Sequence, residues 1–407
     1  MNHFTLSAEY GVHEKNILQT DPFMNRLGSI FRRPLRQEGG ERSSSGFSEA
    51  ADVLQADLCL LPELQFDHHR SLKFTNIIDK EHIDILQLQE RLWSGCVKCE
   101  YRIRESAWKL ILGYLPNRLD RQSEVLRRKR LEYQSLSNAF NANRTHLETT
   151  SASLDASQTS YRQIKIDIPR TCFYSIVFFK SEDVSDLMLR VLYIWSLRNP
   201  ACSYVQGMND VAVPTLIVLL EGKYGQPISM LNNDTGISQR ELEDVEADLY
   251  WIISKLLQDL QDHYTSSQPG IQRMSQKLKG IIQRVDLGLF QHLEFEQVDF
   301  MQISFRWFNC LFTREFKHDC LLRLWDTCIA ESDGFSSFLV YFAAALLNNY
   351  AAELKASSFV QIITLLNNSD ASRERFDIKT METLISEAYV LMSLFHSSPH
   401  HLHLVSP

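Results

Sequence analysis

Hydrophobic residues recur at three- and four-residue intervals along most of this chain, which is the spacing of one helix face. One such stripe follows Ser181 and ends before Asn199-Pro200; its apolar members are Val184, Leu187, Val191, Ile194 and Trp195. A serine followed by two acidic residues is typical of a helix N-terminus, so we predict a helix here. Similar stripes over 245–260 and 274–289 are interpreted as core faces. The pattern predicts a helix-rich fold.

Composition favours the same fold class. The 407 residues are 44% hydrophobic, which is enough for a sizeable core, and they include 15 glycines and 11 prolines. These counts are about half the usual shares of ~7% and ~5%, whereas turn-rich β architectures need more of both residues. No period of fixed length repeats, which argues against a helical solenoid. We therefore expect an all-α fold.

Polar stretches indicate the domain organisation. Residues 1–75 include FRRPLRQEGGERSSSGFSEA, a serine- and glycine-rich run with too few apolar residues to fold alone. We predict a flexible tail there, one domain over 76–396, and a C-terminal tail over 397–407. Two polar segments inside the domain, 141–160 and 222–243, are predicted to be inserted loops.

Charge and hydropathy argue against two classes of protein. The formal net charge of -8 is opposite to the basic excess expected of a general nucleic-acid binder. The longest apolar run, Phe338 to Leu347, is about ten residues long, and crossing a bilayer takes ~20. We interpret that run as a buried core helix and expect no transmembrane segment.

The cysteines do not define a site. Eight of them follow no disulfide-rich pattern and suit a reducing compartment. Cys96-x-x-Cys99 has the spacing of half a zinc site, but no second ligand pair follows at a zinc-like spacing, so a fortuitous pair is favoured over a metal site. The run His318-Asp319-Cys320 lacks the partners that a nucleophilic site needs.

Two short strings about 40 residues apart offer an arginine and a glutamine. Residues 164–170 read I-x-x-D-x-x-R, and residues 204–207 read Y-x-Q-G. Arginine carries a permanent charge on a planar fork that matches phosphate oxygens, and a glutamine amide can both donate to and accept from a water. Alone, the first string is typical of a surface salt bridge and the second of a helix end closed by glycine.

Three further motifs accompany these strings in the order expected of one family. Residues 104–116 read R-x-x-x-W-x-L-x-x-G-Y-x-P, residues 311–315 read L-F-x-R-E, and residues 323–326 read R-x-W-D. Together they resemble the signature of the TBC domain, a family of GTPase-activating proteins that act on Rab GTPases. The phrases IDIPRT, PACSYVQGMND, QPGIQ, FRWFN and RLWDT look closest to the subgroup numbered twenty-two. The resemblance covers roughly residues 90 to 395.

The resemblance implies an all-α domain of two helical lobes with catalytic groups supplied in trans to a Rab-family GTPase. It implies that Arg170 is an arginine finger, which neutralises charge developing on the phosphate, and that Gln206 is a glutamine finger, which positions the attacking water. Supporting roles are expected for Asp167, Tyr204, Gly207 and Asn209. Structural roles are expected for Trp108, Arg323, Trp325 and Asp326.

The chain departs from the family pattern at two places. The proline that usually follows the entrance glycine is absent from Gly95-Cys96-Val97-Lys98. After Arg170-Thr171, where the subgroup tends to have a polar residue and a proline, this chain continues with Cys172-Phe173-Tyr174. The second departure bears on loop geometry and on the choice of partner.

Cofactors and location follow from the same resemblance. It implies that GTP and Mg²⁺ belong to the partner, and the chain contains no P-loop pattern G-x-x-x-x-G-K-[ST], so we expect no cofactor or metal of its own. It also implies a cytoplasmic protein recruited to Golgi or endosomal membranes through partners. Two alternatives stay open: a catalytically silent TBC scaffold that binds Rab or other trafficking partners, and a generic helical interaction protein.

Overall fold

Helices make up nearly all the regular structure of the described residues. The computed structural model describes residues 66–149, 156–171, 176–231, 238–368 and 373–395. Within these ranges no β-strand forms. The all-α fold class predicted from hydrophobic spacing is confirmed.

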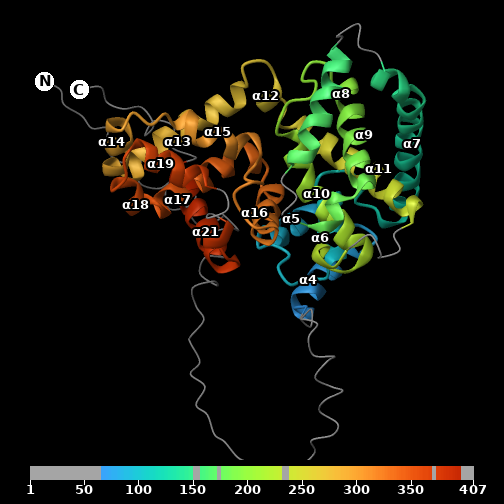
Figure 1. Ribbon diagram of the computed structural model, residues 1–407. Helices are drawn as coiled ribbons and strands as arrows, with labels where there is room; N and C mark the ends of the chain where they lie inside the picture. The colour runs from blue at the N-terminus through green and yellow to red at the C-terminus, as the bar shows by residue number, and fades with distance from the viewer. Residues whose placement is uncertain (1–65, 150–155, 172–175, 232–237, 369–372, 396–407) are drawn as a thin grey trace, which may run out of the picture. The chain divides into compact units, whose positions relative to one another are not determined.

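Two groups of helices are visible in Figure 1, and they correspond to the two lobes that were expected. The first lobe contains α4 (His68–Ile78), α5 (Ile85–Trp93), α6 (Tyr101–Ile111), α7 (Leu119–Thr149), α8 (Ala156–Asp167), α9 (Glu182–Arg198), α10 (Met208–Tyr224) and α11 (Gln239–Gln258). The second contains α12 (Gln261–Tyr264), α13 (Pro269–Val285), α14 (Leu287–Phe295), α15 (Phe300–Asn309), α16 (His318–Ala330), α17 (Leu339–Asn349), α18 (Ala351–Lys355), α19 (Phe359–Asn367) and α21 (Ile378–Phe395). Shorter helical turns are η1 (Ile168–Arg170), η2 (Val177–Lys180), η3 (Ile228–Met230) and η4 (Gly334–Phe338).

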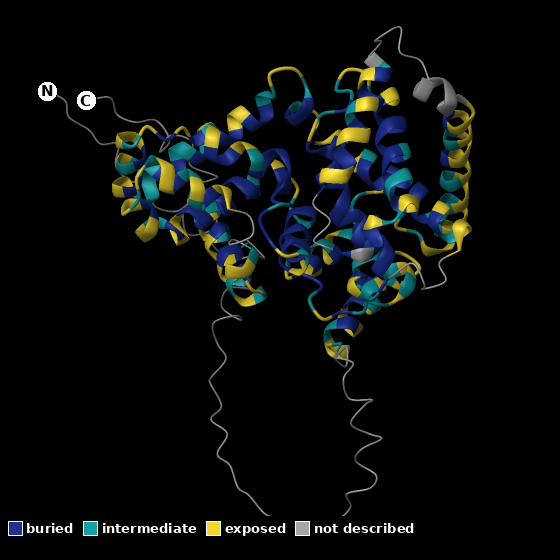
Figure 2. Cartoon of the chain, viewed as in Figure 1, coloured by how far each residue is buried: buried dark blue, intermediate teal, exposed yellow. Residues whose placement is uncertain are grey.

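Helix α9 confirms the prediction made from its apolar stripe. The Ser181 side chain caps it by accepting a hydrogen bond from Val184 N at 3.3 Å, and the helix ends at Arg198, directly before Asn199. Its apolar face and almost all of α10 are buried, as Figure 2 shows, whereas the outer side of α7 is exposed. The apolar run that was interpreted as a core helix forms α17, which is also buried.

The two lobes are joined through Asp326 of α16, whose carboxylate is fully buried. Its Oδ1 accepts a hydrogen bond from Trp108 Nε1 at 2.8 Å, and its Oδ2 accepts one from the backbone N–H of Cys96 at 2.8 Å. Arg104 adds an ion pair at 3.1 Å. The Trp108 and Trp325 rings stack with centroids 5.9 Å apart. These contacts hold the R-x-W-D motif of the second lobe against α6 and the segment that precedes it in the first lobe.

Arg323 joins the same region to α21. Its Nε and Nη2 donate to the two carboxylate oxygens of Glu382 at 2.7 and 2.8 Å, and its Nη1 donates to Thr327 Oγ1 at 2.6 Å. Gly95 lies against this arginine with φ +75°, and an added Cβ would be 2.5 Å from Arg323 Cδ. A glycine is therefore required at the entrance, with or without the proline that the family pattern has after it.

The predicted N-terminal tail, residues 1–75, extended too far. Residues 1–65 lie outside the described residues, but α4 begins at His68, where the Asp67 side chain accepts from Arg70 N at 2.9 Å. Phe74 is completely buried. The helix has only a few apolar residues, so composition missed it, although Asp67 was a usable N-cap signal. The predicted C-terminal tail, 397–407, lies outside the described residues.

The two predicted inserted loops are shorter than expected. Helix α7 continues to Thr149 and α8 begins at Ala156, so most of 141–160 is helical. The serine- and threonine-rich start of α8 packs on α9, with the Tyr161 and Tyr193 ring centroids 5.4 Å apart, and this burial outweighs the modest helix propensity of its polar residues. Likewise, within 222–243, α10 extends to Tyr224 and α11 starts at Gln239.

Candidate functional site

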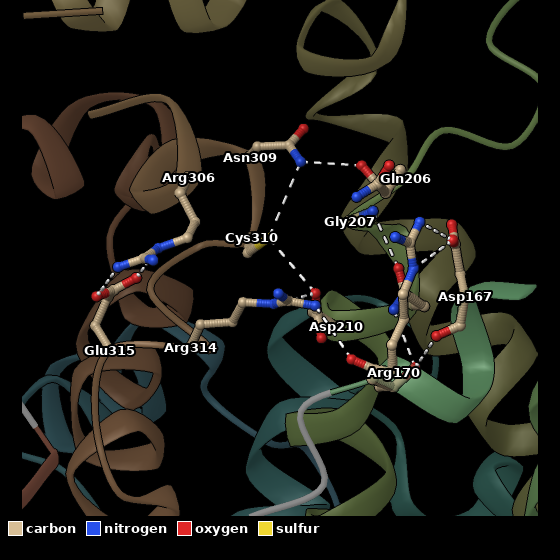
Figure 3. A network of polar contacts seen from close by, with 12 residues as sticks. Asp167, Arg170, Gln206, Gly207, Asp210, Arg306, Asn309, Cys310, Arg314 and Glu315 are labelled. Carbon is tan, nitrogen blue, oxygen red and sulfur yellow. Dashed lines mark hydrogen bonds and ion pairs between the residues drawn. The ribbon is translucent and has the colours of Figure 1, made fainter. Parts of the chain in front are cut away.

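The two motif strings meet in the folded chain. Arg170 ends η1, the short turn after α8, and Gln206 lies in the connection from α9 to α10. A direct bond joins the strings, because the hydroxyl of Tyr204 donates to Asp167 Oδ2 at 2.8 Å. Figure 3 shows Arg170, Asp167, Gln206 and Gly207 gathered at this place. The arginine and glutamine thus belong to one site.

Asp167 is the acceptor that both strings share. Its carboxylate is 0% exposed, and its Oδ1 accepts from Arg170 Nε at 2.9 Å, from Arg170 Nη2, and from Gln163 Nε2 at 2.9 Å. Burial, followed by the hydrogen bond to Asp167, raises the pKa of Tyr204, so this phenol stays protonated and able to donate. Arg170 keeps half of its side chain (49%) exposed. Its guanidinium is oriented by Asp167 yet accessible to a partner.

A second set of bonds passes through Asn209 in the first turn of α10. Asn209 Oδ1 accepts from Gly207 N at 3.0 Å and lies 3.1 Å from the Tyr204 hydroxyl. Its Nδ2 donates to Thr171 Oγ1 at 3.0 Å, and that hydroxyl donates to the carbonyl of Asp167 at 3.1 Å. The loop that contains Arg170 and the loop that contains Gln206 are therefore joined by two sets of hydrogen bonds. This leaves less conformational entropy to be lost when a partner binds.

The second lobe also touches both loops. Asn309, the last residue of α15, donates from Nδ2 to the carbonyl of Gln206 at 3.0 Å. Gly207 has φ +110°, and an added Cβ would lie 2.2 Å from that same Nδ2. Glycine is thus needed for two reasons, a left-handed backbone and a close approach to Asn309. The Gln206 residue itself is exposed.

Arg314 of the L-F-x-R-E motif makes the other contact. Its Nε donates to the buried Asp210 Oδ2 at 2.8 Å, and its Nη2 lies 3.4 Å from the carbonyl of Arg170. Cys310 Sγ is 3.6 Å from the same Asp210 oxygen. The side chain of Arg314 is 33% exposed. The site thus presents two partly exposed guanidinium groups, each beside a buried carboxylate, which suits it to an anionic ligand.

Supporting roles were expected for Asp167, Tyr204, Gly207 and Asn209, and the structure brings all four to the same site as Arg170 and Gln206. No role was predicted for Asn309, Asp210 or Arg314. All three stand in recognised phrases, FRWFN, PACSYVQGMND and L-F-x-R-E, but Arg314 and Asp210 are 104 residues apart, and neither phrase indicates that they pair. The segment Cys172-Phe173-Tyr174, whose departure from the family pattern bears on this loop, lies outside the described residues.

Two other features of the described residues concern metal ligands and the membrane. No group of three or more His, Cys, Asp or Glu side chains in these ranges is placed to hold a metal ion. Among the helices described, none has the length and apolar content needed to span a bilayer. The Cys96 and Cys99 thiols are both buried, and Cys96 uses its backbone N–H to bind Asp326.

Comparison with known proteins gives the family. Residues 101–355 match the Rab-GTPase-TBC domain. The chain is 38% identical over 335 residues to the GTPase-activating protein gyp1 of Schizosaccharomyces pombe, covering 82% of this chain and 63% of that protein. It is 35% identical over 331 residues to TBC1 domain family member 22A of Homo sapiens, covering 81% and 61%. The chain therefore spans about three fifths of the length of these relatives.

A solved structure agrees with this result. The crystal structure of the Ypt/Rab-GAP domain of Gyp1p matches with a TM-score of 0.70 at 33% identity, covering 80% of this chain and 98% of that one. The family match over residues 101–355 includes all the motifs from which the resemblance was inferred. On sequence and on structure, the chain belongs to the Rab-GTPase-TBC domain family.

Proposed function

We propose that this protein stimulates GTP hydrolysis by a Rab-family GTPase, to which it supplies Arg170 and Gln206 in trans. The observation that carries the proposal is the bond between Tyr204 and Asp167, 2.8 Å long, which brings the arginine loop and the glutamine loop into one site. Family membership supports it, since the relatives at 33–38% identity include proteins named as GTPase activators.

Arg170 would act on the charge that develops as the terminal phosphate is transferred. In the unbound protein its guanidinium rests on Asp167, and half of the side chain is exposed. The Asp167 carboxylate is buried, so Arg170 would contact phosphate oxygens through its exposed edge while Asp167 continues to hold the other side of the guanidinium. An arginine finger accelerates hydrolysis by roughly 10³ to 10⁵. Asp167 would therefore act by orienting the finger before the GTPase arrives.

Gln206 would hold the attacking water. Its exposed amide offers both N–H donors and an acceptor oxygen, so it can contact the water and a phosphate oxygen together. In this mechanism the GTPase's own catalytic glutamine is not required for positioning the water. GTP and Mg²⁺ are bound by the partner, and this chain contributes side chains only. Recruitment to Golgi or endosomal membranes would occur through partners.

Single-turnover GTP hydrolysis across a panel of purified Rab proteins tests the proposal. The wild-type protein should accelerate hydrolysis by at least one Rab, and Arg170→Lys should lose most of the roughly 10³-fold or greater stimulation, because an ammonium cannot reproduce the bidentate fork. Arg118→Lys is the matched control, since that arginine pairs with Asp120 in an exposed ion pair on another part of the first lobe. Near-normal activity of Arg170→Lys would exclude it as the finger.

Gln206→Ala tests the second group separately. It should lower the rate on a wild-type Rab without weakening binding, because the lost amide acts mainly in the transition state. A Rab whose catalytic glutamine is replaced should still be stimulated by the wild-type protein. Binding to GTP-loaded Rab with no stimulation of any member of the panel would instead identify a catalytically silent scaffold.

A further inference from the structure

We infer that Asn309 of the second lobe is a positioning residue for the glutamine finger, acting through the backbone of Gln206. This inference rests on the proposed function, since it concerns how that site is assembled. Asn309 lies at the end of α15, 103 residues from Gln206 in sequence, and its Nδ2 donates to the Gln206 carbonyl at 3.0 Å. Figure 3 shows the two residues facing each other across this bond.

The Asn309 side chain is itself held in place. It is 6% exposed, and its Oδ1 accepts from Gln268 Nε2 at 3.3 Å, which sets the orientation of the amide. The Tyr264 hydroxyl donates to the Asn309 carbonyl at 2.9 Å, so the backbone at the helix end is fixed as well. An amide bonded on both sides can transmit the position of α13 and α15 to the glutamine loop.

The glutamine loop is shaped to receive this amide. Gly207 has no Cβ at the point where one would lie 2.2 Å from Asn309 Nδ2, and its φ of +110° turns the chain into α10. On the other side of the turn, Gly207 N donates to Asn209 Oδ1 at 3.0 Å. The Gln206 carbonyl and the Gly207 N–H belong to one planar peptide group, which is thus held by Asn309 of the second lobe on its oxygen and by Asn209 of the first lobe on its nitrogen. The exposed Gln206 side chain leaves the backbone directly before this fixed peptide.

The geometry distinguishes a positioning role from general stabilisation. Catalysis by an amide that holds a water depends on its placement, and a misplacement of about 1 Å can cost ~100-fold in rate. Binding of the GTPase is spread over a larger surface and depends less on this one carbonyl. Loss of the Asn309 bond should therefore lower kcat, leave KM for Rab·GTP nearly unchanged, and matter only while Gln206 is present.

Asn309→Asp is the most direct test because it is isosteric, keeps an acceptor for Gln268, and replaces the donor facing Gln206 with an oxygen. We expect kcat to fall on the order of tenfold, which corresponds to leaving one carbonyl without its partner. In the Gln206→Ala background the same change should cost less than about twofold, whereas its effect should add to that of Arg170→Lys.

Two further variants keep the test decisive. Gln268→Asn introduces a residue that tolerates the left-handed backbone at φ +46°, but its shorter side-chain amide cannot reach Asn309. It should lower kcat less than Asn309→Asp does. This loss should also be absent in the Gln206→Ala background. Tyr133→Phe removes a buried hydrogen bond of 2.7 Å to Glu246 in the first lobe. It should lower thermal stability and leave kcat unchanged.

The outcomes are separable. Wild-type kcat in Asn309→Asp, or a loss that adds fully to that of Gln206→Ala, would overturn the inference while leaving the proposed function in place. If Asn309→Asp does not fold, an unchanged kcat in Gln268→Asn would overturn it. Failure of the wild-type protein to stimulate any Rab would overturn the proposed function and this inference together.

Discussion

His263 should make the folded protein sensitive to mild acid. This histidine of α12 is 1% exposed, and its Nδ1 has no hydrogen-bond partner among the described residues. Burial lowers the pKa of His263 to about 4, and the carboxylate of Asp262 opposes that shift only in part. The ring is therefore neutral in the native state at every pH at which the protein is expected to work.

The sign and size of the effect follow from proton linkage. A histidine in the unfolded chain is protonated as the pH falls through about 6.5, whereas the native ring takes up its proton only near pH 4. The unfolded state binds the proton first, so the free energy of unfolding falls as the pH drops from about 6.5 to 4 and is unaffected by this group at neutral pH. The full loss is about 3.4 kcal/mol, and about 2 kcal/mol is lost by pH 5.

Urea denaturation at two pH values measures this directly. We expect His263→Gln to reduce the difference in free energy of unfolding between pH 7.5 and pH 5.0 by about 2 kcal/mol. Any repacking cost of the substitution is the same at both pH values and cancels. His69→Gln, which removes an exposed histidine of α4, should keep the wild-type pH dependence. If His263→Gln keeps it too, protonation of this ring does not destabilise the protein and the reasoning is wrong.

Two further predictions concern the fold. Asp326→Asn should lower the free energy of unfolding by about 3–5 kcal/mol, because it leaves the guanidinium of Arg104, 12% exposed, without its carboxylate. Urea denaturation measures this loss. The control Asp120→Asn, which changes an exposed ion pair, should have little effect on the free energy of unfolding. Removal of residues 1–65 should leave Rab stimulation and cooperative unfolding intact, because the segment is polar and serine-rich and the first described helix is capped by Asp67. Aggregation or loss of cooperativity in that shortened protein would show that the segment packs on the domain.

Local sequence signals were sufficient wherever one helix face or one cap decided the structure. The apolar stripe after Ser181 predicted α9 together with its N-cap and its C-terminal end, and the apolar run Phe338 to Leu347 predicted α17. Both predictions succeeded because helix periodicity and capping act within a few residues. The same signals failed for α8. Its serine- and threonine-rich start is helical because it is buried against α9, a contact that local propensity does not encode.

The sequence by itself determined the all-α class, several of the core helices, and the two strings that contain Arg170 and Gln206. Only the tertiary structure decided how these residues are held. Asn309 binds the Gln206 carbonyl and Arg314 binds Asp210, over separations of 103 and 104 residues. Hydrogen bonds between segments so far apart in sequence depend on how the lobes pack, and they leave no periodic or neighbouring pattern in the chain. Local motifs were enough to identify the chemical groups of the site, whereas the positions of these groups depend on the packing of both lobes.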